Sequence, residues 1–270
     1  QVVKKGEDFS SVELEKATQY AAEDALMTLK LFNKQLEIFK QRGEDELLSI
    51  AFELEFNFIY VLASMEQKGI KIDVKLLKEY KDRSLIYLNE LTQNIYEACG
   101  ESFNINSPKQ LGVILFEKLG LASSKKTKTG YSTDESVLES LKNEHKVVPL
   151  LLKYREAFKL HSTYIEPLLE LGLKDSENRV FSSFLHTGTT TGRLSSKNPN
   201  LQNIPVGAFS DIQIRRAFIA QEGYKLVGVD YSQIELRLLA HFSKDEALVN
   251  AFKQDLDIHL QTAIKIFGED

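Results

Sequence analysis

Residues 225–242 constrain the fold more than any other stretch, because the hydrophobic period changes within them. Leu226–Val229 is a short apolar run, which is typical of a buried β-strand. Along Ile234–Phe242, every fourth residue is apolar, which is the stripe of an amphipathic helix. The sequence therefore predicts that a strand ends, and a helix is about to begin, at Asp230.

Two interpretations of Asp230 follow from this position. A carboxylate at the end of a strand projects from a rigid edge and is well placed to bind a metal ion. The same position also suits a helix cap, with Ser232 sharing that role. Spacing alone slightly favours the cap.

The composition sets limits on the class of protein. The chain has 270 residues, of which 43% are hydrophobic, enough for a globular protein of two domains or parts of them. No unbroken apolar run approaches about 18 residues, so we expect no membrane span and no membrane partner. The single cysteine, Cys99, cannot form an internal disulfide and fits a reducing cytosol. The five histidines show no zinc-ligand spacing.

The net charge of −5 argues only weakly against nucleic acid, because a DNA-binding face needs no more than a local basic stripe. Such a stripe is present in a stretch rich in hydroxyl residues, at Lys125, Lys126 and Lys128. We interpret it as a loop that could contact phosphates, with a solvated loop as the alternative.

Helical patterns fill most of the chain before residue 178. Asp73 and Ser107 are predicted N-caps, and Ser132 with Glu135 has the pattern of a capping box. Lys159 and His161 are predicted on the polar face of their helix. The helices are expected at residues 11–41, 44–68, 74–99, 108–119, 133–141 and 150–171.

A predicted strand at residues 179–185 leads into a turn rich in threonine and glycine. This turn presents Arg193, and its polar backbone cannot be part of the core. An arginine on a constrained turn favours a groove or phosphate contact.

Four motifs together resemble family A DNA polymerases, the bacterial DNA polymerase I family. Residues 230–237 read DYSQIELR, as in the family's first catalytic motif. Residues 191–196 read TGRLSS and residues 198–205 read NPNLQNIP, which match a second signature. Residues 257–263 resemble the entry to the fingers, and residues 20–24 resemble the third motif of the 3′–5′ exonuclease.

The resemblance implies roles for individual residues of the polymerase site. It makes Asp230 a catalytic ligand of one of two Mg²⁺ ions, which the Tyr231 carbonyl also reaches. Glu235 is a catalytic-site residue that packs on the sugar of the incoming dNTP, near Gln233 and His259. We expect Arg237 to pair with an acidic neighbour.

The resemblance also implies contacts with primer–template DNA. Arg193 reaches the minor groove, where acceptors lie in similar places for every base pair. Gln202 and Asn203 contact nearby duplex, and Lys125, Lys126, Lys128 and Lys159 approach the DNA. Tyr20 and Asp24, four residues apart on one helical face, are an exonuclease remnant.

We therefore expect an α+β chain with a mainly helical thumb and part of an antiparallel palm. The expected domains are an exonuclease-like tail (1–43), the thumb (44–178), the first part of the palm (179–255) and the start of the fingers (256–270). The sequence opens inside a helical pattern and ends without a completed domain, so we expect a fragment of a longer protein. The second catalytic aspartate and the fingers helix have no counterpart, so we expect this fragment alone to be inactive.

The predicted function is template-directed DNA synthesis in replication and repair, by a monomeric DNA-directed DNA polymerase of the bacterial cytosol or nucleoid. A non-catalytic duplex-binding module and a nuclease-only repair protein are the alternatives. Intact Asp230, Glu235 and Arg193 argue against a decayed polymerase site.

Overall fold

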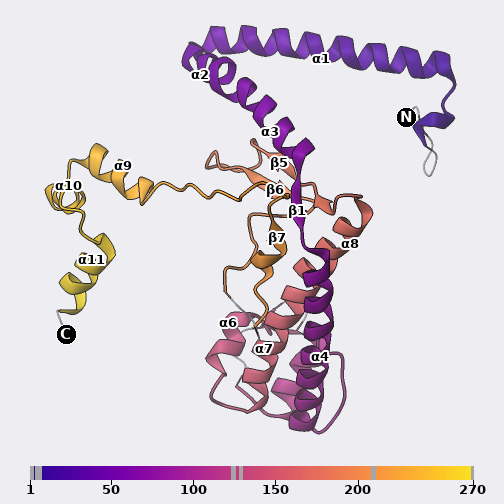
Figure 1. Cartoon of the computed structure of the whole chain (residues 1–270), viewed down its shortest axis with the longest axis vertical. Helices are drawn as coiled ribbons and strands as arrows, with labels where there is room; N and C mark the ends of the chain where they lie inside the picture. Colours follow the sequence, from indigo (N-terminus) through magenta and orange to yellow (C-terminus); the bar gives the residue numbers. More distant parts are fainter. Residues whose placement is uncertain (1–2, 4–7, 123–125, 128–129, 208–210, 269–270) are drawn as a thin grey trace. The chain divides into compact units, whose positions relative to one another are not determined.

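The computed structural model describes residues 3, 8–122, 126–127, 130–207 and 211–268. They form two compact units, Gln1–Ile219 and Ala220–Asp270, and each is described by itself. Long helices and small antiparallel sheets confirm the expected α+β class (Figure 1).

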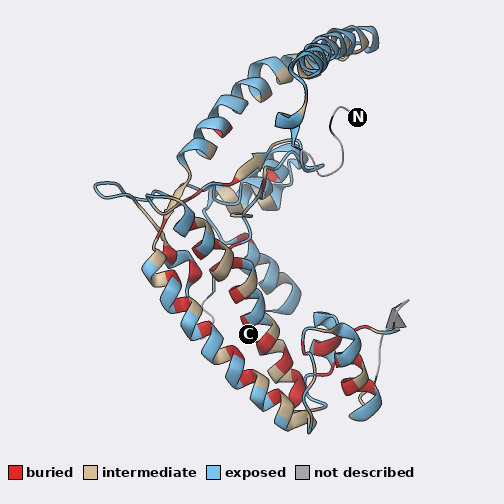
Figure 2. Ribbon diagram, turned by 90° about the vertical axis from the view of Figure 1, so that its right-hand side faces the viewer, coloured by how far each residue is buried: buried red, intermediate tan, exposed pale blue. Residues whose placement is uncertain are grey.

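The first helices follow the predicted boundaries closely. After the short η1 (Phe9–Ser11), α1 (Leu14–Arg42) runs for 29 residues and ends at Gly43. A nearly continuous helix follows as α2 (Asp45–Ile50), the π-helical η2 (Ala51–Glu55) and α3 (Phe56–Lys68). These helices bury very little surface, and α1 has no buried residue (Figure 2).

Gly69 ends α3 because the backbone there requires a glycine. Its φ is 57°, a conformation that L side chains rarely adopt. A Cβ at this position would also lie 2.7 Å from the Phe181 ring and from the Val180 carbonyl oxygen. The chain then turns directly into the first strand of the sheet.

The helical part of the first unit is organised around α4 (Val74–Cys99), whose N-cap Asp73 accepts a hydrogen bond from the Leu76 amide at 2.9 Å. It packs against a long helix that begins at Val147, three residues before the predicted start at residue 150 (Figure 1). That helix consists of α7 (Val147–Lys159), the π-helical η4 (Leu160–Ile165) and α8 (Glu166–Lys174).

Shorter elements complete this region. Ser107 caps α5 (Pro108–Gly112), as predicted, and the π-helical η3 (Val113–Lys118) continues it. The capping box was wrong: the N-cap of α6 (Glu135–Ser140) is Asp134, and Ser132 instead bonds to the Asp134 carboxylate at 2.8 Å.

Two buried clusters lie along α4. The distal cluster contains Leu88, Leu91 and Ile95 of α4, packed on α5, η3, α6 and α7. The proximal cluster contains Leu77 and Tyr80 of α4, packed on η4, α8 and the central sheet. The two cores follow one another along the same pair of antiparallel helices (Figure 2).

The central sheet has the order β4–β1–β7, and both pairings are antiparallel. The predicted strand at 179–185 is divided between two sheets, because the chain leaves the central sheet after Val180. Its second part pairs with β6 instead. The strands are β1 (Ile70–Ile72), β2 (Lys126–Thr127), β3 (Gly130–Tyr131), β4 (Arg179–Val180), β5 (Ser183–Leu185), β6 (Ser195–Lys197) and β7 (Phe218–Ile219).

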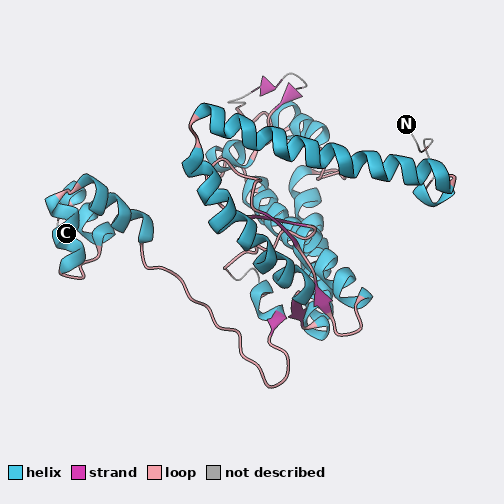
Figure 3. Ribbon diagram, turned by 90° about the horizontal axis from the view of Figure 1, so that it is seen from above, coloured by secondary structure: helices cyan, strands magenta, loops and turns pink. Residues whose placement is uncertain are grey.

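The second unit begins with a loop and continues as α9 (Ile234–Ser243), α10 (Glu246–Lys253) and α11 (Ile258–Phe267) (Figure 3). The predicted strand Leu226–Val229 was wrong. Val227 and Val229 are 81% and 92% exposed, and no strand pairs with them within the described part of the chain. An apolar run without a hydrogen-bonding neighbour does not form a sheet.

One helical segment, Asp45–Lys68, is long and apolar enough to cross a membrane by length and composition. Its mean hydropathy reaches 1.5, although only 6% of the apolar window is buried. The expectation from unbroken apolar runs did not identify it, because Glu53, Glu55 and Asn57 interrupt the run, whereas the many leucine, isoleucine and phenylalanine residues around them keep the mean hydropathy high. A single helix of this kind is weak evidence for a membrane segment.

Candidate nucleic-acid interface and metal site

Arg193 lies in the turn that connects β5 to β6 in their hairpin. Arg193 itself is exposed, which a contact with DNA would require. The Thr189 hydroxyl donates to the Arg193 carbonyl oxygen at 2.7 Å, so the turn is closed across its own ends. The hydroxyl-rich sequence therefore stabilises the backbone that presents the arginine.

This hairpin is tied to the long helix before β1. The Glu66 carboxylate of α3 accepts a hydrogen bond from the Phe184 amide at 2.6 Å. The Glu55 carboxylate of η2 lies 3.3 Å from His186 Nε2. Neither contact was predicted from the sequence, because both join residues far apart in the chain and no local pattern indicates them.

Two buried serines hold the base of the same hairpin. The hydroxyls of Ser182 and Ser196 lie 2.7 Å apart, and both side chains are about 5% exposed. Ser182 donates to the Pro199 carbonyl oxygen at 2.7 Å, while Ser196 accepts from the Leu201 amide at 3.0 Å. The second serine of the TGRLSS motif is thus a buried support for the loop that follows.

That loop carries Gln202 and Asn203, whose side chains are exposed. The Tyr164 hydroxyl of η4 donates to the Asn203 carbonyl oxygen at 2.5 Å. The Arg215 guanidinium donates to the Ile204 carbonyl oxygen at 2.9 Å. Both anchors bind the backbone, so they leave the amide side chains available for a partner.

The predicted lysines differ in what the structure describes. Lys125 and Lys128 lie outside the described residues, and the backbone of Lys126 pairs with Tyr131 in the β2–β3 ladder. Lys159 is exposed and lines a groove of about 400 Å³. The charged residues of that groove are Lys142, Lys153, Arg155, Lys159, Glu135, Glu139 and Glu156.

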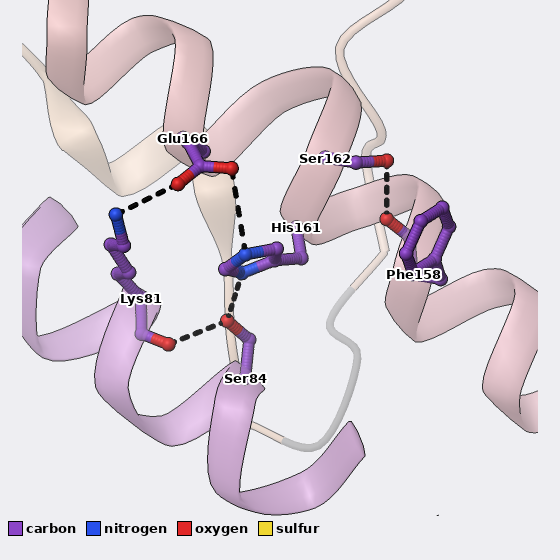
Figure 4. A network of polar contacts seen from close by, with 6 residues as sticks. All are labelled: Lys81, Ser84, Phe158, His161, Ser162 and Glu166. Atoms are coloured by element: carbon purple, nitrogen blue, oxygen red, sulfur yellow. Dashed lines mark hydrogen bonds and ion pairs between the residues drawn. The ribbon is translucent and has the colours of Figure 1, made fainter. Parts of the chain in front are cut away.

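His161 was wrongly predicted on a polar helix face. It is 7% exposed and lies between α4 and η4, with Nδ1 at 2.8 Å from the Ser84 hydroxyl (Figure 4). Its Nε2 lies 3.8 Å from Glu166, whose other carboxylate oxygen accepts from Lys81 at 2.8 Å. Burial lowers the pKa of His161, so the neutral ring is favoured.

In the second unit, Asp230 caps no helix. The N-cap of α9 is Gln233, which has left-handed backbone angles (φ 51°, ψ 38°) and makes no side-chain capping bond. The capping interpretation of Asp230 and Ser232 was therefore wrong. Asp230 and the neighbouring Tyr231 are exposed at the end of the loop before α9, and Glu235 lies exposed in the first turn of that helix.

We expected Arg237 to pair with an acidic neighbour, but its guanidinium contacts a backbone carbonyl group and an aromatic ring. Its Nε donates to the Ser232 carbonyl oxygen at 2.9 Å, and its guanidinium carbon lies 4.6 Å from the centroid of the Phe252 ring. His259 is exposed near the start of α11, where its amide donates to the capping carboxylate of Asp257 at 2.9 Å.

The exonuclease-like pair lies on α1. A hydrogen bond to Asp24, reinforced by the charge of that carboxylate, raises the pKa of Tyr20. The two residues share one face of the helix, as their spacing predicts.

The Asp230 carboxylate and the Tyr231 carbonyl oxygen have the chemistry of ligands for one half of a magnesium site. A carboxylate and a backbone carbonyl are the oxygen ligands that Mg²⁺ prefers, together with waters and substrate phosphates. Within the part of the chain that the structure describes, however, no three side chains of His, Cys, Asp or Glu gather to hold a metal ion. A metal bound here would need further ligands.

Comparison with known proteins decides the family. The model of DNA polymerase family A matches residues 74–270. The chain belongs to this family. It is 47% identical over 246 residues to DNA polymerase I of Helicobacter pylori strain J99, covering 90% of this chain and 27% of that protein. It is 49% identical over 236 residues to DNA polymerase I of Bacillus subtilis, covering 87% and 25%.

This chain also has a fold similar to that of a polymerase domain whose structure has been solved. The chain resembles the POL domain of Pol1 from M. smegmatis, in complex with DNA primer-template and dNTP, with a TM-score of 0.76 and 36% identity. The match covers 85% of this chain and 40% of that one. The family A chain described here spans about a quarter of the length of the curated relatives.

Proposed function

We propose that this family A chain is the thumb and the first part of the palm of a DNA-directed DNA polymerase. The observation that carries the proposal is Asp230, an exposed carboxylate in the DYSQIELR motif that caps no helix. The relative from M. smegmatis was solved with primer-template and dNTP, which supports DNA and dNTPs as partners. The proposed role is DNA synthesis in replication and repair in the bacterial cytosol, by a monomer.

Each site residue has a proposed part in nucleotidyl transfer. Asp230 and the Tyr231 carbonyl hold one of two Mg²⁺ ions, which neutralise charge on the reacting phosphate when bound. Glu235 packs on the sugar of the dNTP and excludes a 2′-hydroxyl, while Gln233 and His259 lie close to the nucleotide. The proposed domains keep the boundaries at residues 43, 178 and 255.

The DNA contacts are proposed for the first unit. Arg193 enters the minor groove and tests the shape of a base pair rather than its identity. Gln202 and Asn203 contact the adjacent duplex. Lys159 and the lysines at 125, 126 and 128 approach the backbone, where their charge makes the affinity depend on salt.

We further propose that the 270-residue chain binds primer–template weakly and does not extend it, because Asp230 is only one of the two aspartates that two-metal catalysis needs in this family. Fluorescence anisotropy with labelled primer–template, at low and moderate salt, tests the binding. Arg193→Ala should weaken binding, whereas Arg42→Ala, which removes a charge from the end of α1, should not.

The outcomes separate the parts of this proposal. Salt-dependent duplex binding that Arg193→Ala weakens supports the interface. Equal binding by Arg193→Ala and the unaltered chain contradicts it. A Mg²⁺-dependent extension product from the purified 270-residue chain would refute the proposed inactivity.

A further inference from the structure

Arg237 connects the turn before α9 to α10 through three contacts. Its backbone amide donates to the Gln233 carbonyl oxygen at 3.0 Å, and its Nε donates to the Ser232 carbonyl oxygen at 2.9 Å. Its guanidinium carbon lies 4.6 Å from the centroid of the Phe252 ring of α10. One residue thus binds two consecutive carbonyl groups of the turn and also rests on the neighbouring helix.

The turn needs such support because its backbone is strained. Gln233 adopts left-handed angles although it is not a glycine, and such conformations persist only where surrounding contacts fix them. Its own side chain makes no capping bond. The side chain that supports this turn is instead that of Arg237, in the first turn of α9.

The chemistry of arginine suits both contacts at once. A planar guanidinium can stack on an aromatic ring while it donates a hydrogen bond from its edge. A lysine at this position would be a strongly hydrated point charge without a plane or a fixed Nε–H. Lysine at position 237 should therefore keep the charge and lose the combination of contacts.

We propose that Arg237 is a positioning residue for the DYSQIELR motif. By holding the Ser232 carbonyl and stacking on Phe252, it fixes the orientation of the turn that presents Asp230 and the Tyr231 carbonyl. This inference rests on the proposed function insofar as those two groups bind a metal ion. The contacts themselves lie entirely within the second unit, Ala220–Asp270.

Backbone order in the 270-residue chain tests the positioning without any catalysis. Nuclear magnetic resonance relaxation should give order parameters for residues 230–233 that fall from about 0.85 towards 0.6 in Arg237→Lys. Phe252→Leu keeps an apolar side chain but removes the ring, and it should loosen the same residues. Lys253→Met removes the adjacent exposed charge of α10 and should change nothing. Unchanged order parameters in both test variants would overturn the proposal.

Metal dependence in the full-length polymerase tests the consequence. Changes that disturb the orientation of metal ligands typically cost about 10-fold to 100-fold in metal affinity. Arg237→Lys should raise the Mg²⁺ concentration for half-maximal primer extension by at least about tenfold. Mn²⁺, which such ligands bind more tightly, should restore part of the rate.

The two measurements distinguish the possible failures. Extension by Arg237→Lys with the Mg²⁺ dependence of the unaltered enzyme would overturn the positioning role while leaving the proposed function intact. Absence of extension by the unaltered full-length enzyme would overturn the proposed function, and the order parameters would then decide alone whether Arg237 fixes the turn.

Discussion

The Ser84 hydroxyl lies 2.8 Å from Nδ1 of His161, at the level where the proximal core gives way to the distal core. Leu77 and Tyr80 of α4 belong to the proximal cluster, whereas Leu88 begins the distal cluster. A polar pair therefore separates two apolar layers that share α4 and the helix containing η4. Figure 4 shows how Glu166 and Lys81 extend this pair into a network.

The network predicts a pH-dependent stability. Burial lowers the pKa of His161 and Lys81 acts in the same direction, while the charge of Glu166 opposes them. The unfolded chain therefore binds a proton near about pH 6.5 before the folded chain does. The contribution is fully present above that pH, and the free energy of unfolding should fall as the pH decreases below it.

Urea unfolding between pH 8 and pH 5 checks this prediction. His161→Gln should remove part of the slope below about pH 6.5, whereas His241→Gln, which changes an exposed histidine of α9, should keep it. Glu166 should stay ionised over this range, because its hydrogen bond to Lys81 lowers its pKa. Identical slopes for the unaltered chain and His161→Gln would contradict the prediction.

Ser196→Ala should destabilise the hairpin that carries Arg193. The substitution leaves the Leu201 amide without its hydroxyl acceptor and removes the partner of Ser182. An unsatisfied buried group costs about 1–3 kcal/mol, which urea unfolding can measure. Ser183→Ala, in the adjacent strand, is the control. A free energy of unfolding equal to that of the control would show that the serine pair is dispensable.

Tyr164→Phe should loosen the loop that carries Gln202 and Asn203. It removes the hydrogen bond to the Asn203 carbonyl oxygen and leaves the ring in place. We expect a loss of about 1 kcal/mol of stability and weaker duplex binding with an unchanged salt dependence, since no charge is lost. A changed salt dependence would mean that this tyrosine acts in another way.

Gly172→Ala should overpack the contact between α8 and β1. A Cβ at Gly172 would collide with the Cδ1 atom of Ile72 and lie 2.9 Å from its Cγ1 atom, and Ile72 is only 1% exposed. Overpacking of this kind costs about 1–3 kcal/mol of unfolding free energy. Gly207→Ala, with no atom of the described residues within 4 Å of the new methyl group, should be nearly neutral. Equal melting temperatures for the two variants would contradict the packing argument.

Local signals predicted the helices well and the sheets poorly. Asp73 and Ser107 cap their helices as expected, because a cap depends on residues within one turn. The run at 226–229 has the composition of a strand, but a strand also needs a neighbour, and none pairs with it in the described residues. Residues 179–185 divide between two sheets for a similar reason.

The residues that support the candidate site could not be predicted from the sequence, for a related reason. Motifs predicted Arg193 and Asp230 as site residues, since their neighbours in the chain form a recognisable pattern. Glu66, Tyr164 and Arg215 act on backbone groups that are distant in the sequence or carry no mark of their own. His161 was misplaced because one polar residue in a helix does not reveal whether a serine on another helix will receive it.

Primer extension by the full-length polymerase, beside its Asp230→Asn variant, tests the central claim most directly. The proposed function predicts Mg²⁺-dependent extension with dNTPs by the unaltered enzyme and its loss in the variant, because the amide cannot replace the charged metal ligand. Full extension by the Asp230→Asn variant would contradict the assignment of Asp230, and extension by neither enzyme would contradict the polymerase function itself.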